Sequence, residues 1–109
     1  MASCKEKIRT EKKLARSRLT DKYINTASRK ICEYLVKSSQ YKNSTTIGCY
    51  LSTKYEVQTG LIISSIFEDE KELFLPKIKS NSEMNFVKIS KKTRFRRNKF
   101  GIKEPDTKN

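Results

Sequence analysis

A chain of 109 residues has room for one domain at most, and its 35% hydrophobic and 34% charged residues supply only a modest core. The 25 Lys and Arg residues against 12 Asp and Glu residues give a formal net charge of +13, which favours nucleic acid, acidic membranes or phosphate-bearing small molecules as partners. The absence of histidine excludes the usual general base and most metal sites, and three glycines are too few for a glycine-rich phosphate loop.

The first predicted element is a basic helix from Lys5 to about Leu19. Its narrow apolar stripe consists of Ile8, Ala15 and Leu19. Lys5 and Arg9 lie four residues apart and therefore on one face, and Arg16 falls near that face. Together with the positive end of the helix dipole, these side chains could hold a polyphosphate. The alternative is a solvated basic helix that packs through its apolar stripe.

A second helix is predicted after Thr20, which is a plausible N-cap, with Asp21 favourable in the first turn and an end near 38–39. One face of this helix is apolar and carries Ile24, Ala27, Ile31, Tyr34 and Leu35.

A strand, a helix and a strand follow within about thirty residues, which predicts a βαβ unit with parallel strands. The first strand, 45–51, has a nearly continuous apolar run typical of burial on both faces. The helix begins after Thr59, and the second strand, 72–75, is expected to stop at Pro76. A third strand is predicted at 84–89. So few strands make a poor parallel sheet, and we expect apolar sheet surface to stay uncovered.

The loop 52–58 is the next candidate for a site, because ligands of open α/β sheets gather at the carboxyl ends of strands. Glu56 is the acidic residue of this loop, and its carboxylate could accept hydrogen bonds from a ring N–H or an amino group. The alternative is an ordinary exposed loop glutamate.

Residues 90–109 show no periodicity and are predicted to form a basic, irregular tail. Within it, 91–99 interleaves Lys and Arg with Phe95, next to Phe100, as binders of single-stranded nucleic acid do. A small basic nucleic-acid-binding protein is therefore the alternative function. No sequence motif of such proteins accompanies the tract, so a solvated surface segment is favoured and nucleic acid is not the expected partner.

Four segments, in this order, resemble the successive motifs of the 5-formyltetrahydrofolate cyclo-ligase family. They are Lys5-x-x-Ile8-Arg9, Tyr50-Leu51-Ser52-x-x-x-Glu56-Val57-x-Thr59, Phe74-Leu75-Pro76-Lys77 and Asn98-x-Phe100-Gly101-Ile102-x-Glu104-Pro105. The resemblance implies an α/β fold, a three-layer αβα domain around a mostly parallel sheet. Residues 1–109 would form the N-terminal portion of that single domain, with an ordered core at about 5–89.

The resemblance also implies a reaction in which ATP, with Mg²⁺, converts 5-formyltetrahydrofolate to 5,10-methenyltetrahydrofolate. It places Leu51 and Glu56 in the folate pocket and assigns no catalytic residue and no protein ligand to a metal. The segment along the ATP would be Lys5, Glu6, Lys7, Ile8 and Arg9. Positioning and charge neutralisation dominate phosphoryl transfer, so the lack of histidine is no obstacle.

This sequence departs from the family pattern at Gln58, where an acidic residue is common, and at Lys77, where Arg is common. It also stops before the family's glycine-rich G-R-G-x-G-Y-Y-D loop, so we expect no turnover from the 109-residue chain alone. No apolar run approaches ~18 residues, so no membrane partner is expected. The widely spaced Cys4, Cys32 and Cys49 favour a reducing compartment, and we expect a cytoplasmic protein whose full-length form is monomeric.

Overall fold

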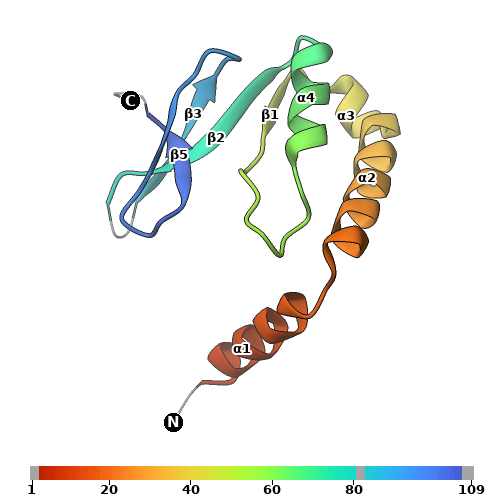
Figure 1. Cartoon of the computed structure of the whole chain (residues 1–109). Helices are drawn as coiled ribbons and strands as arrows, with labels where there is room; N and C mark the ends of the chain where they lie inside the picture. Colours follow the sequence, from red (N-terminus) through yellow and green to blue (C-terminus); the bar gives the residue numbers. More distant parts are fainter. Residues whose placement is uncertain (1–2, 81–82, 107–109) are drawn as a thin grey trace.

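The computed structural model describes residues 3–80 and 83–106, in which the later helices lie beside a short sheet and a β-hairpin, and the N-terminal helix lies apart from them (Figure 1). The elements in chain order are α1 (Cys4–Ser17), α2 (Asp21–Lys37), α3 (Ser39–Asn43), β1 (Thr46–Gly48), α4 (Gly60–Glu68), β2 (Glu72–Ile78), β3 (Met84–Ile89), β4 (Phe95–Arg97) and β5 (Lys103–Pro105). Within the described residues, no helix is both long and apolar enough to cross a membrane.

The two N-terminal helices begin where side-chain caps satisfy their first backbone N–H groups. Ser3 and Glu6 form a reciprocal capping box at the start of α1, and Thr20 accepts a hydrogen bond from the N–H of Tyr23 at the start of α2. The first predicted helix and the Thr20 cap are thereby confirmed, although α1 ends at Ser17 and not near Leu19. The short helix α3 was not predicted; Ser38 caps it by accepting from the N–H of Tyr41 at 3.2 Å.

The sheet has the strand order β1–β2–β3, and its two pairings run in different directions. β1 and β2 are parallel, with Ile47 opposite Leu73, and α4 is their crossover, which confirms the βαβ prediction. β2 and β3 are antiparallel, with Leu75 opposite Val87. In the described residues the sheet is therefore mixed rather than mostly parallel. The connection 79–83 is too short for a parallel crossover, which needs a dozen or more residues.

Two predicted strand boundaries are wrong. β1 is limited to 46–48 and is not buried on both faces, since Thr46 and Gly48 are exposed. β2 does not stop at Pro76 but continues to Ile78. Even-numbered residues of β2 direct their backbone groups toward β1, as the bond from the N–H of Cys49 to the carbonyl of Phe74 shows. Pro76 lies beyond the end of β1, so its missing N–H leaves no partner unsatisfied.

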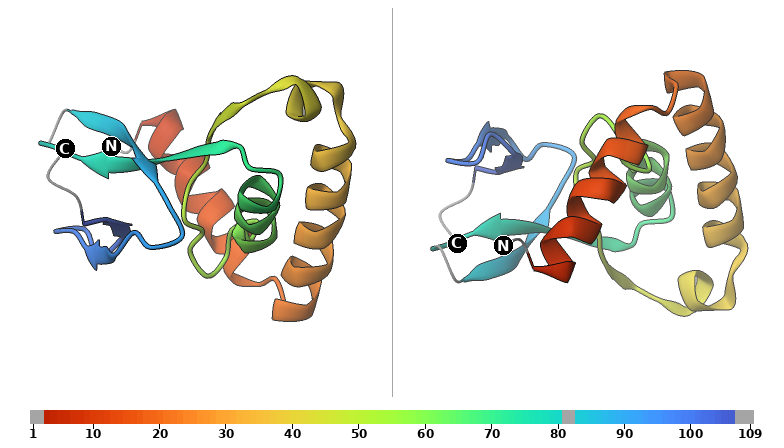
Figure 2. Two further views of the ribbon diagram at one scale, coloured as in Figure 1. Left: turned by 90° about the horizontal axis from the view of Figure 1, so that it is seen from above. Right: turned by 90° about the horizontal axis from the view of Figure 1, so that it is seen from below.

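The core lies between one face of the sheet and the helices α2, α3 and α4. Leu73 and Leu75 of β2 pair across the ladder with Ile89 and Val87 of β3, and all four are buried. The remaining buried members of this cluster are Cys32, Tyr41, Ile62 and Ile66. The views along the vertical axis of Figure 1 show α4 between α2 and the strands (Figure 2).

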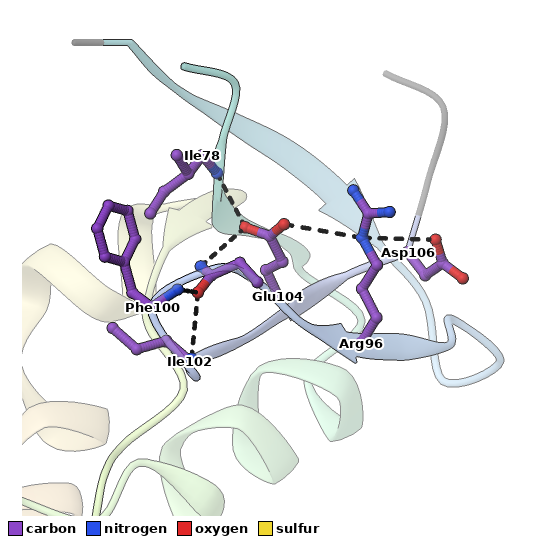
Figure 3. Close-up of polar contacts among 7 residues, drawn as sticks. Ile78, Arg96, Phe100, Ile102, Glu104 and Asp106 are labelled. Atoms are coloured by element: carbon purple, nitrogen blue, oxygen red, sulfur yellow. Dashed lines mark hydrogen bonds and ion pairs between the residues drawn. The ribbon is translucent and has the colours of Figure 1, made fainter. Parts of the chain in front are cut away.

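The segment 90–109, predicted to be irregular, instead contains the antiparallel pair β4–β5. Its turn is closed by Asn98, which accepts from the N–H of Phe100 at 2.9 Å and of Ile102 at 3.2 Å (Figure 3). Gly101 has a φ of 74°, which a glycine adopts without strain. The turn is built from Asn and Gly, which are common turn residues. It was not predicted because the polar side chains around it obscured the strand pattern on both sides.

Glu104 of β5 fastens the hairpin to the sheet. Its side chain is buried, and one carboxylate oxygen accepts from the N–H of Ile78 at 3.0 Å and from Asn98 Nδ2 at 3.3 Å. Arg96 lies 3.8 Å from the other oxygen and also 3.8 Å from Asp106 (Figure 3). This carboxylate occupies the edge of β2 that β1 leaves open.

Candidate functional site

The loop 49–59 leaves the carboxyl end of β1 and is held in shape by hydrogen bonds to its neighbours. Thr59 Oγ1 donates to the carbonyl of Tyr50 at 2.7 Å rather than capping α4. The N–H of Thr59 donates to Ser52 Oγ at 3.2 Å. The N–H of Gln58 donates at 2.8 Å to Ser28 Oγ, which is buried on α2. The loop is thus a built structure rather than a free connection.

Glu56 is the half-buried carboxylate of this loop. Its Oε1 accepts from the N–H of Thr53 at 2.8 Å and from Thr53 Oγ1 at 2.7 Å. Gln58 supports the turn by donating from Nε2 to the carbonyl of Glu56 at 2.9 Å. Both described bonds use Oε1, so Oε2 is available to a ligand. The position of the carboxylate is therefore fixed before anything binds.

Glu56 lines a cleft of about 370 Å³ together with aromatic side chains, which we call the tyrosine cleft. Its lining residues are Arg16, Leu19, Tyr23, Ile24, Ala27, Tyr50, Tyr55, Glu56 and Val57. Burial, and secondarily the charge of Glu56, raises the pKa of Tyr50, which keeps its phenol protonated as a hydrogen-bond donor. An apolar wall, three phenols and one carboxylate suit a planar heterocycle that carries N–H donors.

The basic face of α1 leads toward this cleft. At about 100° per residue, Lys5, Arg9 and Arg16 lie within about 40° of one another around the helix. Arg16 lines the tyrosine cleft, so Lys5 and Arg9 extend the same face away from it. Arg9 lies about 10 Å from Arg16 along the helix axis. The arrangement forms a row of cations that begins at the cleft.

The other residues of the predicted ATP segment have different positions. The side chain of Glu6 belongs to the capping box of α1. Lys7 lies about 200° around the helix from Lys5. Ile8 is 55% exposed and contributes to the apolar stripe. Every residue of the segment is exposed, and none lines the tyrosine cleft itself.

Leu51 lies on the other side of the loop and lines a second cleft, of about 540 Å³, between the loop and the β4–β5 hairpin. This hairpin cleft is lined by Leu51, Ser52, Thr53, Lys54, Arg97, Gly101, Ile102 and Lys103. Leu51 and Glu56 were both predicted for one pocket, but they line two different clefts, one on each side of the loop. Tyr50, which precedes Leu51 in the chain, lines the tyrosine cleft with Glu56. Two cations of the hairpin cleft, Arg97 and Lys103, were not predicted as site residues, because the hairpin itself was not predicted.

The basic tract 91–99 is partly engaged within the protein. Arg96 pairs with Glu104 and Asp106, and Arg97 donates to the carbonyl of Gly101 at 2.8 Å. Arg96 and Arg97 therefore bind groups of the protein itself, whereas a nucleic-acid-binding surface would present such side chains to phosphates. Among residues 3–80 and 83–106, no group of three or more His, Cys, Asp or Glu side chains could hold a metal ion.

Comparison with known proteins places the chain in a family. A profile described as the 5-formyltetrahydrofolate cyclo-ligase family matches residues 1–109. A probable 5-formyltetrahydrofolate cyclo-ligase of Schizosaccharomyces pombe is 29% identical over 108 residues, covering 97% of this chain and 53% of that protein. A probable cyclo-ligase of Caenorhabditis elegans is 30% identical over 82 residues, covering 72% of this chain and 40% of that protein.

The fold has a solved counterpart as well. The NMR structure of Aquifex aeolicus 5,10-methenyltetrahydrofolate synthetase aligns with a TM-score of 0.82 at 26% sequence identity, covering 96% of this chain and 53% of that one. The chain therefore spans about half the length of the relatives that it matches from end to end.

Proposed function

Because the chain belongs to the 5-formyltetrahydrofolate cyclo-ligase family, we propose that it supplies one half of an ATP-dependent cyclo-ligase site. The reaction would convert 5-formyltetrahydrofolate to 5,10-methenyltetrahydrofolate. One observation carries the proposal: Arg16, from the basic face of α1, and Glu56, the fixed carboxylate of the loop after β1, line the same cleft. A row of cations and a carboxylate among phenols suit the two substrates, a nucleotide and a pterin.

The folate would bind along the loop. Glu56 Oε2 would accept from the N–H and amino groups of the pterin, and the tyrosines would pack against its ring. Leu51 would contact the folate from the hairpin cleft. The fixed turn around Glu56 supports this role, because a carboxylate already held in place loses little conformational entropy on binding.

The nucleotide would lie along α1, where Lys5 and Arg9 would bind phosphate oxygens by charge-assisted hydrogen bonds. Glu6 is proposed to act through the helix cap that it forms, and Lys7 and Ile8 flank the cationic face. Mg²⁺ would be carried by the phosphates. In the proposed reaction the formyl oxygen takes a phosphoryl group, N10 attacks the activated carbon, and phosphate leaves. This chain's contribution is to position and neutralise charge.

The full-length protein would be a monomer, and its single domain would have three αβα layers around a mostly parallel sheet. The residues described here would form the ordered first part, including the hairpin. All three cysteines are free, which supports a reducing compartment, and we propose the cytoplasm.

The test joins residues 1–109 to the part of the fission yeast relative that this chain does not match, and follows methenyltetrahydrofolate formation by absorbance. Arg9→Ala should weaken ATP binding by roughly 1.5–3 kcal/mol, about 10- to 150-fold, and should weaken folate binding much less. Glu56→Gln should weaken folate more than ATP. Arg18→Ala is the matched control, because Arg18 follows α1 on the face opposite Lys5. Normal kinetics in both site variants would refute the assignment, and turnover by the 109-residue chain alone would refute its being half of a site.

A further inference from the structure

Gln58 is a half-buried residue of the loop 49–59 that lines neither the tyrosine cleft nor the hairpin cleft. Its side-chain amide nevertheless makes three hydrogen bonds inside the loop. Nε2 donates to the carbonyl of Thr53 and to the carbonyl of Glu56, both at 2.9 Å. Oε1 accepts from Ser52 Oγ at 3.3 Å. Since an amide nitrogen carries two N–H donors, the nitrogen of Gln58 is fully used within the protein.

The partners of this amide determine which chemical group can stand at position 58. Both acceptors of Nε2 are main-chain carbonyl oxygens, which cannot donate, so the group that faces them must supply two donors. Ser52 Oγ accepts from the N–H of Thr59 at 3.2 Å and gives its own proton to Gln58, which must therefore also supply an acceptor. An ionised glutamate has the same shape but only accepts, and a lysine only donates. The position thus requires an amide.

The two carbonyls that Gln58 binds belong to the ends of the turn 53–56, and this turn lies between the two clefts. Thr53 and Lys54 line the hairpin cleft, whereas Tyr55 and Glu56 line the tyrosine cleft. Thr53 also holds Glu56 Oε1 through its N–H and its Oγ1. Because Gln58 binds both ends of the turn at once, it fixes the side of the loop to which each of these four side chains is directed.

The main chain of Gln58 is attached to the helical wall of the tyrosine cleft. Its N–H donates at 2.8 Å to Ser28 Oγ, and Ser28 is only 3% exposed on α2. Ile24, about one helical turn before Ser28, lines the cleft, as does the neighbouring Ala27. A single residue therefore joins the turn that carries Glu56 to the helix that forms another wall of the same cleft, and it sets how far apart they lie.

We propose that Gln58 is a positioning residue, which directs Glu56 Oε2 into the tyrosine cleft at a set distance from α2 and does not touch the ligand itself. Because the amide is uncharged, Glu56 is the single carboxylate of 49–59, so the N–H donors of a pterin meet one acceptor in one place. The inference rests on the proposed function for the identity of the ligand. The hold of Gln58 on the turn is measured without any ligand.

The test uses residues 1–109 joined to the unmatched part of the fission yeast relative, and measures the binding of 5-formyltetrahydrofolate and of ATP by calorimetry. Gln58→Glu keeps the shape of the side chain and removes both donors, and Gln58→Met removes them without adding a charge. Each should weaken folate binding about 5- to 150-fold, as expected for two lost hydrogen bonds, and should change ATP binding much less. Gln40→Glu is the control, because it makes the same chemical change at an exposed glutamine of α3.

Two further measurements separate positioning from a general loss of stability. In a Glu56→Gln background, Gln58→Met should cost little more folate binding, because Gln58 acts through Glu56. Without ligand, the N–H groups of Thr53, Gln58 and Thr59 should exchange faster in Gln58→Met, since their acceptors lie in the network that the amide holds.

Additive losses in the double variant would overturn the proposal, as would unchanged exchange at these three groups or an equal effect of Gln40→Glu. Faster exchange in a joined protein that binds no folate would refute the proposed function and uphold the hold of Gln58 on the turn.

Discussion

Removing the carboxylate of Glu104 should separate the β4–β5 hairpin from the sheet. The side chain is buried, and among residues 3–80 and 83–106 it is the acceptor for the N–H of Ile78 at the edge that β1 leaves open. Glu104→Ala takes that acceptor away, and it also removes the acceptor of Asn98 Nδ2 and one of the two carboxylates near Arg96.

The expected loss follows from the three contacts. A hydrogen bond from a buried N–H to a charged acceptor contributes about 1.5–3 kcal/mol. The bond from Asn98, at 3.3 Å, adds about 0.5 kcal/mol, since a half-buried amide can turn to water. Arg96 is 55% exposed and 3.8 Å away, so its contribution is at most about 0.5 kcal/mol. Glu104→Ala should therefore cost about 2–4 kcal/mol, a large share of the roughly 5–15 kcal/mol expected for this length.

Urea unfolding, followed by far-ultraviolet circular dichroism at low protein concentration, measures this loss. With a slope of about 1.5 kcal/mol per molar, the midpoint should fall by about 2 M. Glu104→Gln keeps an acceptor for Ile78 and should lose about half as much. Asp106→Asn alters only the exposed pair with Arg96 and should change little. Equal midpoints for Glu104→Ala and Asp106→Asn would refute the role of Glu104 as the link between hairpin and sheet.

Three further outcomes follow from other contacts. Tyr41 is buried and donates to Asp69 at 2.5 Å, so Tyr41→Phe should cost about 1–2 kcal/mol in the same unfolding assay. Burial and then Asp69 raise the pKa of Tyr41, so the stability it provides is present below about pH 10 and lost as pH rises, a loss that Tyr41→Phe should abolish. The hydrogen bond from Lys88 lowers the pKa of Glu72, so the stability that this pair provides is present above about pH 4.3 and is lost as pH falls. Lys88→Gln should raise the pKa of Glu72 in an NMR titration. Gly101→Ala should cost about 1 kcal/mol of unfolding free energy, because φ is positive there.

The helices α1, α2 and α4 and the parallel pair could be predicted because local chemistry decides them. Thr20 and Ser3 present their oxygens to backbone N–H groups one turn later, whatever the tertiary structure. The spacing of strand, helix and strand leaves few alternatives to a right-handed βαβ unit. Long-range contacts decided what was predicted wrongly: Pro76 is tolerated because β1 ends before it, and no feature of 72–76 alone reveals that.

The candidate site was predicted unevenly for the same reason. Glu56 could be found because it follows a strand. Tyr23 could not, since it reaches the cleft only through the position of α2 against the loop. The hairpin had usable signals in Asn98 and Gly101, which close its turn, but the charged residues around them concealed the strand alternation.

The two sides of the proposed site differ in how well this chain fixes them. Hydrogen bonds within the described residues hold the loop around Glu56 and attach the hairpin through Glu104. In contrast, α1 carries Lys5 and Arg9 and buries nothing. A partner that covers the apolar stripe of α1 would therefore order the cationic face far more than the loop. Calorimetry should accordingly show that joining residues 1–109 to the unmatched part of the fission yeast relative strengthens nucleotide binding more than it strengthens pterin binding, since the conformational entropy of α1 is lost beforehand. Equal gains for both ligands would mean that α1 is already positioned without a partner.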